Sequence, residues 1–351
     1  MEPYLMLEAE YAKYLKVDPQ CTVAVSSGTS GLHIALETLQ LDLTEDNLVL
    51  VPDFTMVACP RAVTLAGLTP KFVDCDPDTY LMDNNQVSHC LQFDKGRGNI
   101  KAIMPVHIYG RLCDMFQIHD ICSGLLLRDV SVIEDLSEVN TVAPHPESYA
   151  GVYSLYKNKI IHGEEGGMIV FRDRGKADLA RRLRCLGFTP EHDFYHIPRG
   201  INARLSNANA LQVFRSLYVA DCSVARRKEH SAAYYERLPK AWHPVTIAEV
   251  PWVCDFRIRG MTLYQQTELV RNVNKANPYA ALRHGFKPMS QQSEYVQLNS
   301  SLKVTGSRLK PYEICYLPLE GDWVGNHTDT ERMEEIVHTL ICEAKQLGLE
   351  V

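Results

Sequence analysis

The chain has 351 residues, more than the roughly 250 to 300 at which a single hydrophobic core usually divides. Its 46% hydrophobic and 23% charged residues are ordinary for a globular protein, and its net charge of −7 excludes a basic surface for nucleic acid. We therefore expect a large and a smaller domain that bind no nucleic acid.

The N-terminal segment is acidic and lacks the basic-then-apolar order of a secretory signal. No apolar run approaches the ~18 residues that a membrane helix needs. The eleven cysteines are scattered, and none forms a C-x-x-C pair. Cysteines used in this way favour reduced thiols over disulfides or a metal site. We expect a cytoplasmic protein with no metal and no contact with a membrane.

Strands and helices alternate over the first half of the chain. A strand, a Ser-Gly-Thr turn and a helix are predicted over residues 21–39, because apolar residues recur at helical spacing from Leu32 onwards. A helix is predicted within 55–67, and further strands within 47–54, 71–83, 100–110 and 130–139. This alternation predicts an α/β domain with a mostly parallel sheet.

The second half has a different texture. Helices are predicted over 177–188 and, as one long helix or two, over 205–238. Beyond residue 238 we expect strands within 246–261 and 307–321, and a closing helix over 328–348 with Thr328 as a possible cap. We place a large domain at residues 1–222 and a smaller α+β domain at 223–351.

Ligands of parallel sheets bind at the carboxyl ends of the strands, so the polar residues there are candidates. These are Ser27, Gly28, Thr29, Asp53, His107 and Asp135. The Ser-Gly-Thr turn could bind an anion at a helix start, although such a turn is more often only a turn. Asp135 needs a partner if it is buried: either a cap or salt bridge, or the protonated ring nitrogen of pyridoxal phosphate (PLP).

Two lysines, Lys157 and Lys159, precede a glycine-rich turn in the stretch YSLYKNKIIHGEEGGMIV, residues 153–170. Most lysines lie on the surface with the charge in water, so two exposed charges in a loop are one interpretation of this pair. A Schiff-base lysine, however, needs small neighbours that let the backbone approach the cofactor closely, and this turn supplies them. A phosphate turn, a carboxylate and a lysine, in that order, together fit PLP.

Several ordered segments carry a resemblance to a known family. They are SSGTSGLHIAL (26–36), PDFTMVA (52–58), FVDCDPDTYLMD (72–83), PVHIYGRLCDM (105–115), VIEDLSE (132–138), the stretch at 153–168, and GINARLSNANALQ (200–212). Together they resemble motifs of the DegT/StrS family of PLP-dependent nucleotide-sugar aminotransferases, closest to its perosamine-synthase-like branch. The resemblance implies a fold-type I large domain, like that of aspartate aminotransferase, and a smaller C-terminal domain.

The resemblance also implies roles for individual residues. Lys159, not Lys157, matches the Schiff-base lysine that moves the proton, and Asp135 matches the partner of the ring nitrogen. The remaining cofactor-binding positions are Gly28, Thr29, Ser30, Met56, Glu138, Ser154 and Asn202. Met56 stands where many members have an aromatic residue that stacks on the ring. Asn202 would reach the phosphate across a dimer interface, which implies a homodimer with shared active sites.

The substrate positions implied by the resemblance are His107, His162, Glu165 and Arg204. His107 is expected to pack or hydrogen-bond more than to transfer a proton. His162 lies in HGEEGG, where the family has T-T-G-E-G-G, and this departure would alter the substrate mouth. The chain also starts close to its first motif, whereas most relatives have a longer N-terminal segment that frames the nucleotide-sugar pocket.

The implied function is transfer of an amino group from L-glutamate, through the PLP and pyridoxamine phosphate forms of the cofactor, to a nucleotide-linked keto sugar. The acceptor would be a 4-keto-6-deoxyhexose of the perosamine or viosamine type, used in ping-pong order. One alternative acceptor is a cyclitol or a modified nucleotide. A sugar dehydratase would have histidine in place of Lys159, and a non-catalytic relative would have lost Lys159 or Asp135; both residues are present.

Overall fold

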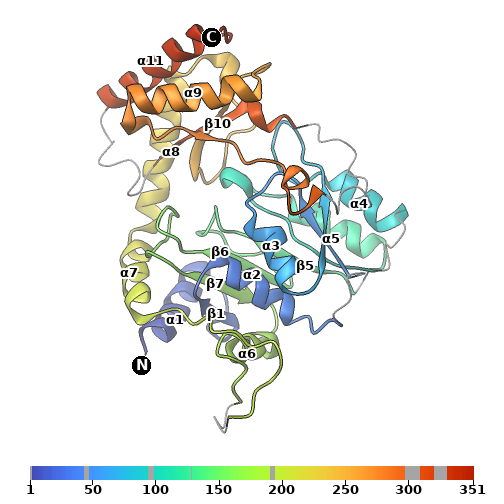
Figure 1. Ribbon diagram of the computed structural model, residues 1–351. Helices are drawn as coiled ribbons and strands as arrows, with labels where there is room; N and C mark the ends of the chain where they lie inside the picture. Colours follow the sequence, from blue (N-terminus) through green and yellow to red (C-terminus); the bar gives the residue numbers. More distant parts are fainter. Residues whose placement is uncertain are drawn as a thin grey trace.

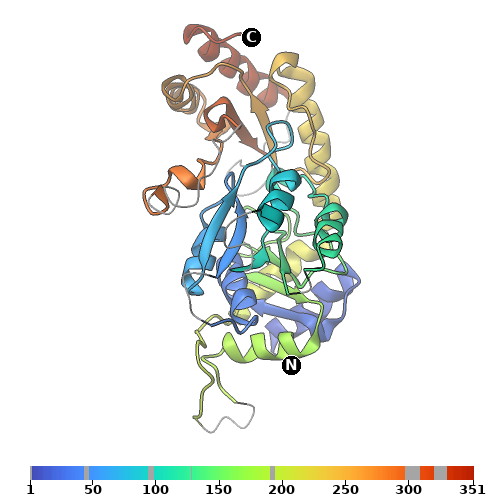
Figure 2. The same cartoon turned by 90° about the vertical axis from the view of Figure 1, so that its right-hand side faces the viewer.

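The structure is a computed structural model that describes residues 2–42, 47–93, 99–127, 129–189, 194–296, 309–319 and 330–351. A large part is built on a seven-stranded sheet and a small part on a three-stranded sheet (Figure 1). Helix α8, Ala220–Arg237, runs along one side from the large part to the small one (Figure 2). The predicted domain boundary at 222/223 falls in the first turn of this helix, and the division itself stays a prediction.

The sheet of the large part is mostly parallel, with strand order β1-β7-β6-β5-β4-β2-β3. Among these strands only β7 runs antiparallel to its neighbours, β1 and β6. The strands are β1 Thr22–Val25, β2 Leu48–Pro52, β3 Thr69–Val73, β4 Ile100–Ile103, β5 Ser131–Asp135, β6 Ala150–Ser154 and β7 Gly167–Phe171. The α/β class predicted from the alternation of strands and helices is thus confirmed.

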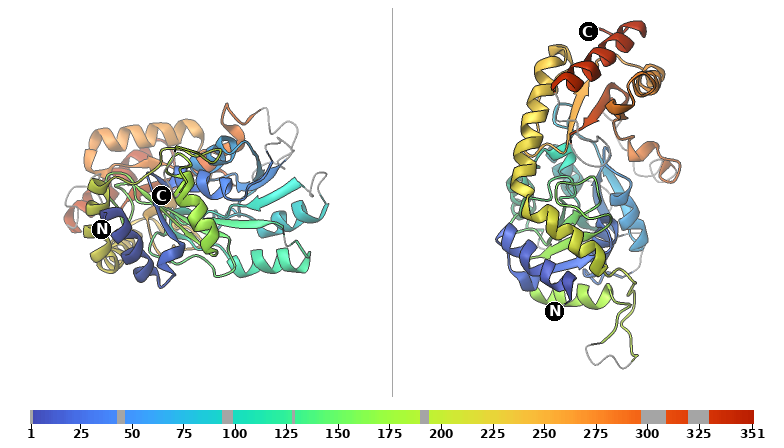
Figure 3. Two further views of the ribbon diagram at one scale, coloured as in Figure 1. Left: turned by 90° about the horizontal axis from the view of Figure 1, so that it is seen from below. Right: turned by 90° about the vertical axis from the view of Figure 1, so that its left-hand side faces the viewer.

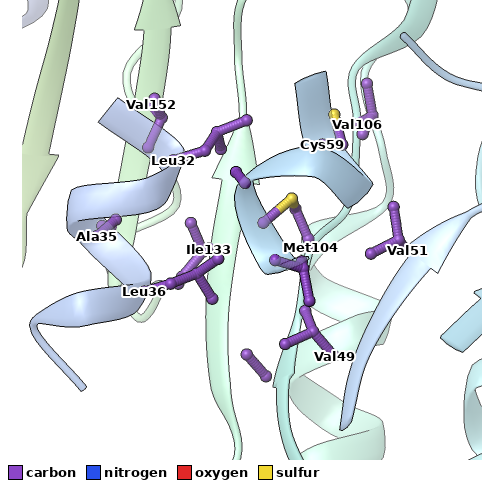
Figure 4. Packing of buried hydrophobic residues seen from close by; sticks show 14 of the residues in the cluster. Leu32, Ala35, Leu36, Val49, Val51, Cys59, Met104, Val106, Ile133 and Val152 are labelled. Atoms are coloured by element: carbon purple, nitrogen blue, oxygen red, sulfur yellow. The ribbon is translucent and has the colours of Figure 1, made fainter. Parts of the chain in front are cut away.

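Helices pack on both faces of this sheet, so nearly every strand residue is buried. Val23 and Val25 belong to the core under α2, whereas Ala24 between them belongs to the core under α1. Figure 4 shows the α2 face, where Leu32 and Leu36 point toward the strands. The helices are α1 Pro3–Leu15, α2 Gly28–Glu37, α3 Ala58–Leu65, α4 Asn84–Phe93, α5 Met115–Gly124, α6 Arg174–Leu183 and α7 Asn207–Tyr218.

The small part pairs an antiparallel sheet, in the order β8-β10-β9, with helices α8, α9 and α11 (Figure 3). Its further elements are β8 Val253–Arg257, α9 Leu263–Ala276, β9 Arg283–His284, β10 Ile314–Pro318 and α11 Thr330–Gln346. The stretch 205–238 forms two helices, α7 and α8, and Thr328 lies outside the described residues. No helix in the described ranges is long and apolar enough to cross a membrane.

The two parts meet closely at the carboxyl edge of the large sheet. Gly110 has a φ of +94°, and a Cβ on it would lie 2.0 Å from the carbonyl oxygen of Val250. Asp53, at the end of β2, is buried and accepts hydrogen bonds from the backbone N–H (2.7 Å) and the hydroxyl (2.9 Å) of Ser290. These contacts place the small part over the strand ends, where the candidate residues lie.

Candidate functional site

A cavity of about 420 Å³ lies at the carboxyl ends of the strands, within the size range of small-molecule sites. The small part contributes aromatic side chains to its wall, namely Trp252, Phe286 and Tyr316. The large part contributes the start of α2 and the segments that follow β2, β4, β5 and β6. Predicted residues in the wall are Gly28, Thr29, Met56, Asp135, Glu138, Ser154, Lys159 and Glu165.

The N-terminus of α2 faces the cavity. Ser27 caps the helix: its hydroxyl accepts from the N–H of Ser30, and the Ser30 hydroxyl accepts from the N–H of Ser27. This capping box leaves the N–H groups of Gly28 and Thr29, the first two of the helix, on the cavity wall. Such N–H groups and the helix dipole together favour an anion.

Gly167 of β7 allows the start of α2 to approach the sheet. A Cβ on Gly167 would lie 2.5 Å from the carbonyl carbon and oxygen of Ser27, closer than atoms can pack. We therefore expect Gly167→Ala to push Ser27 away, to lower the free energy of unfolding by about 1–3 kcal/mol, and to weaken anion binding.

Chemical denaturation and phosphate titration would measure both effects. Gly124→Ala is the matched control, because nothing lies within 4 Å of a Cβ added there. Equal losses in the two variants would contradict the proposed approach of α2 to β7.

Asp135 ends β5 and is held by two donors inside the protein. Its Oδ1 accepts from the N–H of Ser137 at 2.9 Å, and its Oδ2 accepts from the thiol of Cys59 at 3.0 Å. Cys59 is fully buried in the first turn of α3, and burial raises the pKa of its thiol well above the usual value. The thiol therefore stays protonated and donates to the carboxylate. The two hydrogen bonds together fix the orientation of the Asp135 side chain.

Lys159 has its amine inside the cavity, 3.9 Å from Oε1 of Glu138. The other oxygen of Glu138 accepts from the N–H of Tyr109 at 2.5 Å, and Tyr109 adopts a positive φ of 55°. Burial lowers the pKa of Lys159, although the negative charges of Glu138 and Asp135 act to raise it. Burial raises the pKa of Glu138. A lowered pKa makes a lysine amine more available as a nucleophile and a proton carrier.

His107 is buried, but its side chain makes its hydrogen bonds outside the cavity wall. Its Nδ1 accepts from the N–H of Cys113 at 3.1 Å, so the proton lies on Nε2, which donates to Glu134 at 3.1 Å. The bond to His107 helps to lower the pKa of Glu134 against the effect of burial. This geometry supports the packing and hydrogen-bonding role expected for His107.

The other predicted residues are not part of the cavity wall. Ser30 is part of the capping box. The backbone N–H and C=O of His162 both bond the hydroxyl of Ser216 on α7. Asn202 and Arg204 are exposed and line a separate surface cleft beside the N-terminus of α1.

Sequence reasoning missed several members of the wall and its support: Cys59, Ser137, Tyr156, Asn158, Trp252, Phe286 and Tyr316. Cys59 had no clear signal in the sequence: it stands four residues after Thr55, and only the fold brings the Thr55 hydroxyl to 3.3 Å from its sulfur. Trp252, Phe286 and Tyr316 had none, because they come from the small part.

The residues fit PLP, the cofactor implied by the resemblance. A Cβ on Gly28 would lie 3.0 Å from Cβ of Ser154 and 3.4 Å from the hydroxyl of Ser137, so two hydroxyls gather beside the α2 N–H groups. That cradle suits a phosphate, the buried carboxylate of Asp135 suits a protonated ring nitrogen, and the amine of Lys159 suits a Schiff base. All three groups belong to one cavity.

The comparisons with known proteins identify the family. The family model of the DegT/DnrJ/EryC1/StrS aminotransferase family matches residues 4–340. The GDP-perosamine synthase of Escherichia coli O157:H7 is 32% identical over 225 residues, 62% of this chain and 59% of that protein. The Caulobacter vibrioides GDP-perosamine synthase is 31% identical over 244 residues, 68% of this chain and 62% of that protein. The matched segments thus span about three fifths of these relatives.

Solved structures share the fold. Helicobacter pylori PseC, an aminotransferase involved in the biosynthesis of pseudoaminic acid, superposes with a TM-score of 0.84 at 18% identity, over 99% of this chain and 92% of that chain. A DegT DnrJ EryC1 StrS aminotransferase from Brucella abortus superposes with a TM-score of 0.79 at 22% identity, over 96% and 90% of the two chains. The fold expected from the resemblance is confirmed.

Proposed function

Since this chain belongs to the DegT/DnrJ/EryC1/StrS aminotransferase family, we propose that it is a PLP-dependent aminotransferase. The amino donor is L-glutamate, and the acceptor is a nucleotide-linked keto sugar. Within that class we propose a 4-keto-6-deoxyhexose of the perosamine or viosamine type. The names of the relatives, GDP-perosamine synthases among them, support this choice.

One observation carries the proposal: an amine, a buried carboxylate and a helix N-terminus line the same cavity. The N–H groups of Gly28 and Thr29, with the Ser154 hydroxyl, would bind the phosphate. Asp135 would keep the ring nitrogen protonated, and PLP, when bound, supplies an electron sink for the bond that breaks at the substrate carbon. Lys159 would take the proton from that carbon and return it one position along.

The residue at position 159 bears on the alternatives. A dehydratase of this family would need histidine where the cavity holds the Lys159 amine. A non-catalytic relative would have no reason to keep a buried lysine beside two carboxylates, because burying charge is costly. Both observations favour amino transfer.

We also propose that two copies share their active sites. Asn202 and Arg204 are exposed and lie outside the cavity of their own chain, so they are free to reach the cavity of a second copy. Sedimentation that finds only monomers at working concentrations would contradict this part of the proposal.

The test is an absorbance spectrum of the protein with added PLP, before and after L-glutamate. We expect a visible band that gives way to the shorter-wavelength band of pyridoxamine phosphate when glutamate is added. Lys159→Ala should lose the visible band, because no amine remains in the cavity to bind the cofactor covalently.

Lys157→Ala is the matched control. Lys157 lies two residues away, its amine is 6.0 Å from the Tyr156 ring centroid, and it is not part of the cavity wall. Its removal should leave the band and the glutamate response unchanged. A wild-type band that is indifferent to glutamate would contradict the proposed donor, and equal effects of the two variants would contradict the role of Lys159.

A further inference from the structure

Trp252 of the small part contacts the lysine segment at two points. Its indole N–H donates to the carbonyl oxygen of Asn158 at 2.8 Å. The amine of Lys159 lies 3.9 Å from the centroid of its ring. One side chain thus binds both the backbone before the lysine and the amine at its end.

The indole is itself held firmly. The backbone carbonyl of Trp252 accepts from Arg227 at 2.7 Å, and its side chain is almost completely buried. Tyr109 stacks near it with centroids 6.4 Å apart and an interplanar angle of 28°, and Tyr316 lies 6.1 Å away at 39°. These contacts leave the ring little freedom to turn, so it is a fixed surface for the amine.

The amine therefore lies between the carboxylate of Glu138, 3.9 Å away, and the face of an aromatic ring. Both favour a protonated amine, the first by opposite charge and the second by the negative potential of the ring face. In an amino transfer Lys159 would act as a free base. A free four-carbon side chain moves widely unless something holds it.

We propose that Trp252 is a positioning residue for Lys159, holding its free amine and its backbone in place for proton transfer. This inference rests on the proposed function. In the step concerned, the C–H bond of the substrate breaks and an N–H bond forms on neutral Lys159. The electron pair of the broken bond would be taken up by PLP, which supplies an electron sink when bound. The ring then faces the ammonium that results.

The first test uses the protein without cofactor and needs no activity. Acetic anhydride modifies free amines, and peptide mass spectrometry gives the labelling of Lys159 relative to Lys157 in the same molecule. We expect Trp252→Phe to raise this ratio several-fold, because the indole N–H contact is lost and the smaller ring holds the amine less closely. An unchanged ratio would overturn the inference.

Trp242→Phe is the matched control. It removes the same kind of bond, an indole N–H donated to a backbone carbonyl, here that of Glu350 at 2.7 Å. Trp242 is also buried but stacks on Phe256 inside the small part. Its replacement should leave the labelling ratio at the wild-type value. A matching rise in both variants would indicate general loosening and would overturn the specific role.

The second test follows the reaction with glutamate in a single turnover. Trp252→Phe should slow it about tenfold, with little change in glutamate affinity, because a misplaced base loses rate rather than binding. The isotope effect with α-deuterated glutamate should rise as proton transfer becomes more limiting. Trp242→Phe should change neither. If Trp252→Phe keeps the wild-type rate and isotope effect, the inference fails although the proposed function stands.

If Trp252→Phe does not fold, the same labelling can be done on protein of wild-type sequence in which tryptophan is replaced by tetrafluorotryptophan. Fluorination keeps the shape of the indole but removes the negative potential of its face. The labelling ratio of Lys159 to Lys157 should again rise, and an unchanged ratio would overturn the contribution of the ring. If the protein forms no visible band with PLP, the proposed function fails, whereas this labelling result still reports on Trp252.

Discussion

Asp135→Asn should slow the single-turnover reaction with glutamate about a thousandfold while leaving the fold intact. The carboxylate is buried, and the N–H of Ser137 and the thiol of Cys59 aim it into the cavity. An amide has the same shape, and its oxygen can still accept from the N–H of Ser137, but its NH2 group cannot accept from the Cys59 thiol and it has no charge to keep a ring nitrogen protonated. Stopped-flow absorbance of the variant loaded with PLP would measure the rate.

Asp114→Asn is the matched control for that substitution. Asp114 caps α5 by accepting from the N–H of Gln117, and asparagine caps helices about as well as aspartate. This variant should keep the wild-type rate. A loss below about tenfold in Asp135→Asn would contradict the pairing of Asp135 with the cofactor ring.

Cys59→Ala separates the charge of Asp135 from its orientation. The substitution removes the donor to Oδ2 and leaves the Ser137 bond to Oδ1. Its effect should therefore be much smaller than that of Asp135→Asn, and Cys59→Ser, which restores a donor, should recover most of the loss. The rates of these variants should be measured together with that of Asp135→Asn, because all of them report on the Asp135 carboxylate.

Local patterns were enough to predict part of the site in the large part. Asp135 follows an apolar run, and the end of a parallel strand is where ligands bind. Ser27 and Gly28 stand between a strand and an amphipathic segment, which is where a helix begins with free N–H groups. Each of these inferences needs only residues that are neighbours in the sequence.

The remainder of the site depends on contacts between distant segments. Trp252 enters the cavity because the small part folds over the strand ends, and nothing near residue 252 indicates that. Similarly, the sequence around 153–170 does not predict β6 and β7 as two strands. Short apolar runs beside a glycine-rich turn are compatible with strands, helices or loops. The direction of the His107 side chain depends on Glu134 and Cys113, which only the folded chain brings to it.

Asp255→Asn should lower the free energy of unfolding by about 3–5 kcal/mol, because it leaves a buried guanidinium without its counter-charge. Arg111 has no exposed surface, and its Nη2 lies 2.8 Å from Oδ2 of Asp255. Its Nε also donates to the carbonyl oxygen of Thr246, and its Cζ lies 4.8 Å from the Tyr80 ring centroid. Denaturant titration followed by circular dichroism would measure the loss.

Two controls define the origin of that loss. Glu10→Gln removes a partner from the exposed pair with Lys13 and should change stability by less than about 1 kcal/mol. The double variant Arg111→Met with Asp255→Leu should recover most of the stability, because neither charge then remains buried. The double variant also removes two buried polar atoms, Nη1 of Arg111 and Oδ1 of Asp255, which have no hydrogen-bond partner among the described residues.

The position of this pair gives the experiment a second readout. Arg111 follows β4 in the large part, and Asp255 lies in β8 of the small part, so the pair joins the two. Weakening it should separate one cooperative unfolding transition into two, with the small part unfolding first. The cavity wall formed by Trp252 would be lost in that first step, so cofactor should protect the variant against it by mass action. A single transition that PLP does not shift would contradict this coupling between the interface and the site.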